Sequence, residues 1–75
     1  MAGKISIIGQ IAEIDREIRL REQVYPRQVQ AGKIKKEEAE MLMSRIQAVR
    51  ATLFFCQQNE TAIREYIAAK KTGAA

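Results

Sequence analysis

The spacing of apolar residues in two long runs constrains this chain more than any other feature. In the first run, isoleucines recur at positions 7, 11, 14 and 18, so the spacings are four, three and four residues. In the second run, apolar residues recur at the same spacings from Ala39 to Ile67, with Glu60 as the polar exception. Such spacings place residues on one face of an α-helix, whereas a strand alternates at every second residue. The sequence therefore predicts an all-α fold.

The only proline and a nearby glycine separate the two runs. Pro26 removes a backbone donor and crowds the preceding helical turn, so we expect a kink or break near it. Gly32 is suited to the left-handed residue that ends a helix. We therefore predict a first helix over about residues 4–31, with a kink near Pro26.

The second helix is expected over about residues 36–71. Its first turns carry Glu37, Glu38 and Glu40, where the helix dipole favours negative charge. The polar stretch CQQNET, at residues 56–61, leaves open a break that would start a third helix near Thr61. Because the connection between the two main helices is short, they should form an antiparallel hairpin.

The predicted hairpin has more apolar surface than it can bury. We expect one stripe of the second helix to face the first helix, with Val49 level with Ile18. The stripe consists of Ala39, Leu42, Ile46, Val49, Leu53 and Cys56. A single domain of 75 residues has only a small core, and oligomerisation is the common remedy. We therefore predict a homo-oligomeric helical bundle, although the remaining hydrophobic side chains could also be scattered surface residues. The expected oligomer interface consists of Met43, Phe54, Phe55, Ile63, Tyr66 and Ile67.

The sequence offers little basis for catalysis. It contains no histidine and one cysteine, and it lacks a glycine-rich phosphate loop and metal-ligand spacings. The helix dipole explains Glu37, Glu38 and Glu40 without a metal ion, and Cys56 fits a buried, inert thiol. We therefore expect a protein that is not an enzyme and uses no metal or cofactor. A single cysteine and the lack of an apolar run of about 18 residues suggest a cytoplasmic protein with no membrane partner.

Basic residues crowd the connection between the two helices, and the formal net charge of +4 favours an anionic partner. Arg21 and Tyr25 continue the isoleucine stripe, at positions where leucine would pack better. Tyrosine offers a ring and a hydroxyl group, and arginine offers a planar fork for phosphate or carboxylate. We predict an anion pocket made by Arg21, Tyr25, Arg27 and Lys33; the alternative is a structural corner with solvated cations.

The stretch REQVYPRQVQAGKIKKEEAE resembles a family of small phage and prophage proteins with the motif R-x-x-V-Y-P-x-x-V-x-x-G-K/R. The matching positions run from Arg21 to Lys33 and continue in the E-E-A start of the second helix, within a match over about residues 16–51. Lys35 departs from the usual Ser or Thr cap, and the tail from Gln57 is longer than usual. The resemblance brings no assigned activity, but it implies a phage protein that acts in the cytoplasm of an infected bacterium.

Three functions remain open on these grounds. Small phage proteins commonly bind host components, and several unrelated helical ones sequester nucleotide second messengers of bacterial immunity. The leading hypothesis is therefore a counter-defence protein that binds an anionic nucleotide signal without cleaving it. The second is a protein-interaction module that uses Met41, Met43, Phe54 and Phe55 to inhibit or adapt a host or phage protein. The third is a nucleic-acid-binding accessory protein, which is disfavoured because acidic residues interrupt the basic ones.

Overall fold

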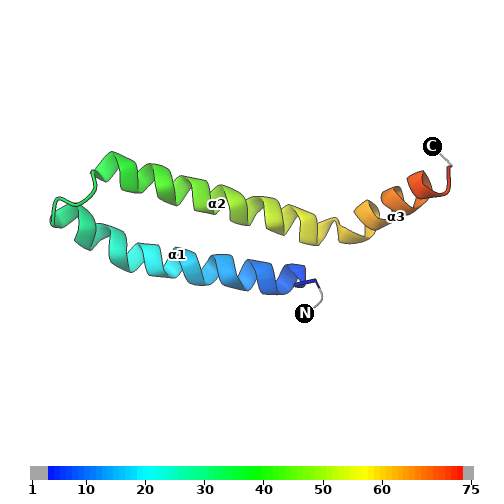
Figure 1. The fold of residues 1–75 in the computed structure, drawn as a ribbon, viewed down its shortest axis with the longest axis horizontal. Coiled ribbons are helices and arrows are strands. Elements are labelled where there is room, and N and C mark those ends of the chain that lie inside the picture. Colours follow the sequence, from blue (N-terminus) through cyan, green and yellow to red (C-terminus); the bar gives the residue numbers. More distant parts are fainter. Residues whose placement is uncertain (1–3, 74–75) are drawn as a thin grey trace.

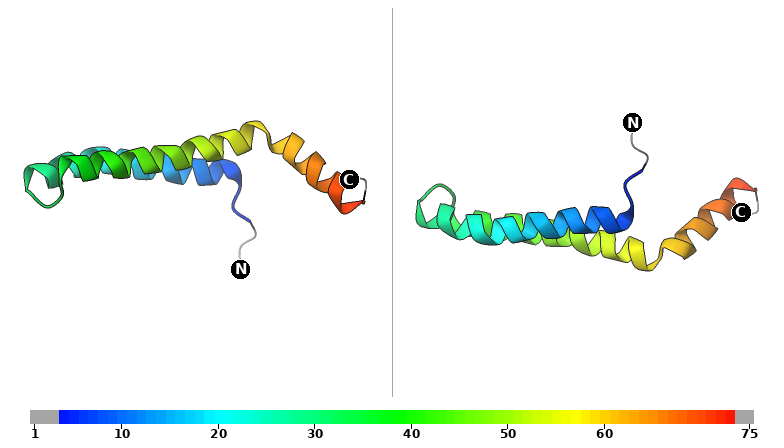
Figure 2. Two further views of the ribbon diagram at one scale, coloured as in Figure 1. Left: turned by 90° about the horizontal axis from the view of Figure 1, so that it is seen from above. Right: turned by 90° about the horizontal axis from the view of Figure 1, so that it is seen from below.

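Three α-helices make up the part of the chain that the computed structural model describes, residues 4–73. They are α1 (Ile7–Gln30), α2 (Lys36–Gln58) and α3 (Glu60–Lys71), and this part of the chain contains no strand. Helices α1 and α2 lie side by side and antiparallel, and α3 extends beyond the N-terminal end of α1 (Figures 1 and 2). The predicted all-α class is confirmed.

Both ends of α1 are closed by hydrogen bonds. At its start, the Gly9 amide donates to the Ser6 hydroxyl oxygen at 3.1 Å, which is an N-cap contact. At its end, Gly32 adopts a φ of +75°, and the amides of Gly32 and Lys33 donate to the carbonyls of Val29 and Gln28. This Schellman motif confirms the expected role of Gly32 and turns the chain back toward α2.

Pro26 lies inside α1, and the helix continues past it to Gln30. A break at this position is therefore excluded. Because proline has no backbone N–H, the carbonyl of Glu22 has no α-helical donor four residues further on. That carbonyl therefore lacks the usual hydrogen bond of an α-helix.

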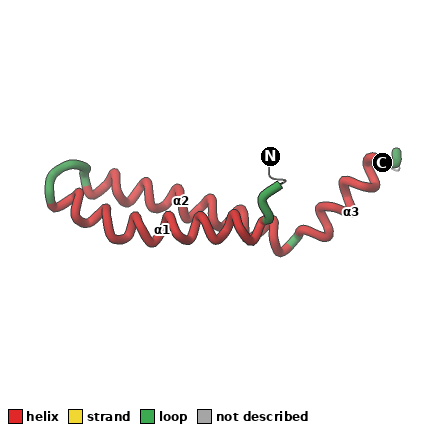
Figure 3. Tube along the Cα trace, turned by 60° about the horizontal axis from the view of Figure 1, so that its bottom comes forward, coloured by secondary structure: helices red, strands yellow, loops and turns green. Residues whose placement is uncertain are grey.

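A single residue interrupts the predicted second helix, so the prediction of one continuous helix over residues 36–71 is wrong. Asn59 has φ −111° and ψ 15°, outside the helical range, and separates α2 from α3 (Figure 3). Its side-chain amide donates to the Phe55 carbonyl at 2.8 Å, and its backbone N–H donates to the same oxygen at 3.1 Å. Asparagine competes for backbone groups in this way, which explains why the break falls here. The third helix starts at Glu60, one residue before the alternative start at Thr61.

The core between α1 and α2 is thin. Among the described residues, Ala39 and Ile46 are the only buried hydrophobic ones. Val49 is 46% exposed and therefore does not pack in the predicted stripe, in which it was expected to lie level with Ile18. Arg50 instead reaches α1, where its Nε donates to Asp15 Oδ1 at 2.6 Å. An α-helix repeats every 3.6 residues, so a stripe drawn with a strict seven-residue repeat drifts off the contact line.

Within residues 4–73, helix α3 contacts no other helix than α2. All twelve of its residues are exposed. None of the helices within residues 4–73 has both the length and the apolar content needed to cross a membrane. The apolar side of α3 is therefore uncovered in the single chain.

Candidate functional site

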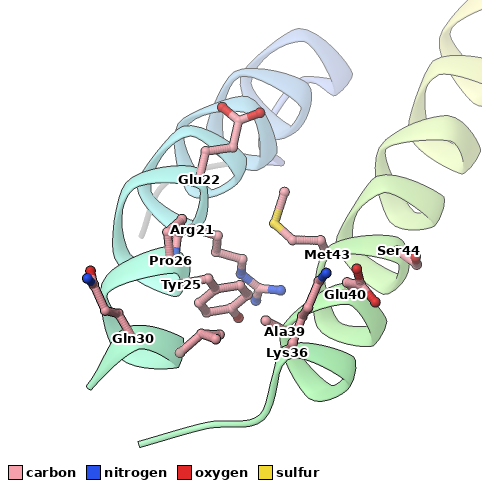
Figure 4. Close-up of a pocket in the computed structure, with 11 residues that line it drawn as sticks. Arg21, Glu22, Tyr25, Pro26, Gln30, Lys36, Ala39, Glu40, Met43 and Ser44 are labelled. Atoms are coloured by element: carbon pink, nitrogen blue, oxygen red, sulfur yellow. The ribbon is translucent and has the colours of Figure 1, made fainter. Parts of the chain in front are cut away.

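A groove lies between α1 and α2 near the corner of the hairpin. Its volume is about 770 Å³, which falls within the range typical of small-molecule sites. Most of its lining is apolar and comes from Tyr25, Pro26 and Val29 of α1 and from Ala39 and Met43 of α2. Figure 4 shows the side chains of Arg21, Tyr25, Lys36 and Met43 directed into the space between the helices, with Gln30 and Ser44 at the outer edges.

Arg21 ties the two helices together at this groove. Its Nη1 donates to the carbonyl of Leu42 at 3.1 Å, and its Nε donates to Glu17 Oε2 at 2.9 Å. The guanidinium carbon lies 5.8 Å from the centre of the Tyr25 ring, within cation–π range. A guanidinium has five N–H donors, and these two hydrogen bonds leave others free for a ligand. The arginine is thus held in place while retaining donor capacity.

Tyr25 and Pro26 form the α1 wall of the groove. Tyr25 is half-buried, with its ring beside the Arg21 guanidinium. Glu22 also lines the groove, and its carbonyl is the one that Pro26 leaves without an α-helical donor. The wall therefore combines an aromatic ring with a backbone carbonyl that lacks its usual α-helical donor.

The charges around the groove are mixed. Arg21 and Lys36 contribute two positive charges, and Glu22 and Glu40 contribute two negative charges. The groove is therefore less cationic than the sequence of the turn suggests. A ligand that fits it needs anionic groups for the cations and hydrogen-bond donors for the carboxylates.

The structure brings together two of the four predicted ligand residues. Arg21 and Tyr25 line the groove, whereas Arg27 and Lys33 do not. Arg27 lies in the last turn of α1, where its charge suits the helix dipole, and Lys33 lies in the corner after Gly32. Lys36, the first residue of α2, also lines the groove but is not among the predicted ligand residues, because no spacing in the sequence places it beside α1.

A second, smaller groove lies against the same two residues. Its volume is about 140 Å³, and Leu20, Val24 and Gln28 line it together with Glu17, Arg21 and Tyr25. Arg21 and Tyr25 therefore contribute to both grooves. All six residues that line this smaller groove belong to α1.

The residues predicted at the oligomer interface are accessible. Met43 is half-buried in the main groove, and Phe54 and Phe55 are 41% and 61% exposed. In α3, Ile63, Tyr66 and Ile67 are all exposed, and Tyr66 reaches 63%. A cation lies over each of two of these rings: the Arg50 guanidinium carbon is 5.8 Å from the centre of the Phe54 ring, and Lys70 Nζ is 5.6 Å from the centre of the Tyr66 ring.

The remaining titratable groups do not add a reactive centre to the groove. Within residues 4–73, no group of three or more His, Cys, Asp or Glu side chains could hold a metal ion, and this includes Glu37, Glu38 and Glu40. Cys56 is a half-buried free thiol. A hydrogen bond from Arg16 lowers the pKa of Glu13 and raises that of Arg16, but neither residue lines the groove. Comparison of the chain with models of protein families, with curated proteins and with solved structures gives no match.

Proposed function

We propose that this chain is a non-enzymatic binding protein that sequesters an anionic, base-containing ligand of the nucleotide class. One observation supports this above the others: an aromatic ring, a guanidinium and an ammonium group converge on a mainly apolar groove of about 770 Å³. Nucleotides present an aromatic face together with phosphates, and proteins bind them by stacking and by charge-assisted hydrogen bonds. The groove supplies partners for both.

The aromatic and charged residues of the groove each have a role in this proposal. The Tyr25 ring stacks on the base, while Arg21 and Lys36 hold the phosphates. Glu22 and Glu40 accept hydrogen bonds from the amino or imino groups of the base, so the mixed charge of the groove favours a nucleotide over a simple anion. Because Glu17 and Leu42 already position Arg21, little side-chain entropy is lost on binding.

The resemblance to small phage and prophage proteins supports a biological setting for this binding. A phage protein that holds a nucleotide signal of bacterial immunity, without cleaving it, lowers the free concentration of that signal. Sequestration requires affinity and abundance but no catalytic group. We therefore propose a counter-defence role.

The test is native mass spectrometry of the purified protein with a panel of cyclic and ADP-ribose-type nucleotides. We expect one nucleotide class to be retained, and Lys36→Gln and Tyr25→Ala to weaken its binding about tenfold, since a charge-assisted hydrogen bond contributes about 1.5–3 kcal/mol and the stacking of a base on an aromatic ring about 1–3 kcal/mol. Arg27→Gln is the matched control, because it removes one positive charge outside the groove lining. Equal binding by all four proteins, with unchanged helical circular dichroism, would show that the groove is not the ligand site.

The exposed aromatic residues of α2 favour a second candidate, a module that binds a host or phage protein. Phe55 is 61% exposed, and Met41 and Phe54 on the same helix are each more than 40% exposed. Aromatic residues and methionine are enriched in protein interfaces. A single host protein captured by the parent chain and lost with Phe55→Glu, at unchanged oligomer mass, would favour this candidate over nucleotide binding.

A further inference from the structure

We infer that α3 of one copy lies over the groove of a second copy, so that the groove is completed by a partner chain. The inference rests on the proposed function only in assigning the completed site to a ligand. Three properties of the chain support the contact between α3 and the groove: its exposed area, its shape and its charges.

The exposed area of the chain calls for a partner. A compact monomer of 8.5 kDa exposes about 4,650 Å². This chain exposes 6235 Å², an excess of about 1,600 Å². If two copies each bury that excess, the interface totals about 3,200 Å², which is in the range of obligate dimers. The excess area is therefore large enough for a stable dimer of this chain.

Helix α3 and the groove match in chemistry and length. Ile63, Tyr66 and Ile67 recur at spacings of three and one along α3, and they form an exposed apolar stripe. A helix of 12 residues is about 18 Å long, while the α1 side of the groove, from Arg21 to Gln30, spans about 14 Å. An amphipathic helix in an apolar groove is a common recognition mode.

The groove and α3 lie at opposite ends of the chain. The groove lies at the corner of the hairpin, and α3 lies at the other end of a molecule 57 Å long (Figure 2). Two copies side by side and antiparallel therefore bring each α3 level with the groove of the other. This arrangement is a two-fold symmetric dimer, in which both grooves and both α3 helices are used and the assembly closes.

The partner's helix adds the groups that the groove lacks. Tyr66 brings a second aromatic ring, and Lys70, whose Nζ lies 5.6 Å from that ring, brings a further positive charge. Lys70 and Lys71 form the basic end of α3, which is complementary to Glu22 and Glu40 in the groove lining. A nucleotide in the completed site would be held between Tyr25 of one copy and Tyr66 of the other.

Site-specific cross-linking without any nucleotide tests this contact. In a Cys56→Ala background, a copy with Ala62→Cys on α3 is co-expressed with a differently tagged copy that carries one reporter cysteine. The reporter is Gln30→Cys or Ser44→Cys at the edges of the groove, or Glu38→Cys as a control on α2 outside the groove lining. A short bismaleimide should join the two tagged copies at least fivefold more efficiently through residue 30 or 44 than through residue 38.

Equal cross-linking at all three reporters, or none, would overturn the inference, as would a monomer across the working concentration range. As a second measurement, Ile63→Glu with Ile67→Glu should give a monomer by native mass and a lower unfolding temperature than the parent. A retained dimer would also count against the contact. Since neither measurement uses a ligand, cross-linking without nucleotide binding would reject the proposed function alone, and nucleotide binding without cross-linking would reject this inference alone.

Discussion

Arg21 carries more contacts than any other polar side chain of the hairpin corner. It links α1 to the Leu42 carbonyl of α2, pairs with Glu17 and lies against the Tyr25 ring. Because only two hydrophobic residues between positions 4 and 73 are buried, such polar links between helices take on a larger share of the stability. The same side chain that binds a phosphate in our proposal therefore also supports the fold.

Replacing Arg21 with methionine should lower the free energy of unfolding by about 1–2 kcal/mol. Methionine keeps the apolar stem but loses the hydrogen bonds to Leu42 and Glu17, and the value is discounted because the side chain is 24% exposed. Arg19→Met, at an exposed position of the same helix, should change stability by less than about 0.5 kcal/mol. Urea unfolding followed by circular dichroism, at one protein concentration, measures both. An equal loss of unfolding free energy in both variants would mean that the contacts of Arg21 with Leu42 and Glu17 do not stabilise the fold.

At this scale, part of the site was predictable. Arg21 and Tyr25 are four residues apart, so their place on one helical face follows from the sequence. Arg27 is two residues from Tyr25 and therefore points elsewhere, which the same spacing argument would have shown. Lys36 joins the groove only because α2 folds back onto α1, and its approach depends on the geometry of the corner. Glu22 and Glu40 enter for the same reason.

At the scale of elements, the corner and the break at Asn59 decide how the three helices are arranged. The corner depends on the left-handed conformation of Gly32, and the break depends on an asparagine that caps its own preceding helix. The glycine was predictable from its position after the first apolar run. The register of α2 was not, because the choice between Val49 and Arg50 at the interface rests on an ion pair with Asp15 that a hydrophobic stripe does not encode.

Gly32→Ala should destabilise the hairpin by about 1 kcal/mol. A Cβ at this residue meets no atom within 4 Å, so the cost comes from the positive φ alone. Gly32→Asn should cost less, because asparagine tolerates the left-handed region. Thermal unfolding of the two variants beside the parent gives the order. A Gly32→Asn protein less stable than Gly32→Ala would contradict a purely conformational role.

For the whole molecule, the shortage of core makes stability a property of the assembly. If folding is coupled to dimerisation, the unfolding temperature depends on protein concentration by mass action. For a dimer of this size, we expect Tm to rise by about 4 °C for each tenfold increase in concentration. Circular dichroism melts over a hundredfold range measure this. A constant Tm would identify a stable monomer and would count against the partner contact of α3.

The interruption at Asn59 also sets the rotational phase of α3. Across an unbroken helix, each residue turns the apolar stripe by about 100°, so the direction of Ile63, Tyr66 and Ile67 would be fixed by their count from α2. With the hydrogen-bond ladder reset at one residue, that direction is set instead by two backbone torsions. The outward stripe can therefore be re-aimed by changes at a single position, while the hairpin and its groove keep their own register.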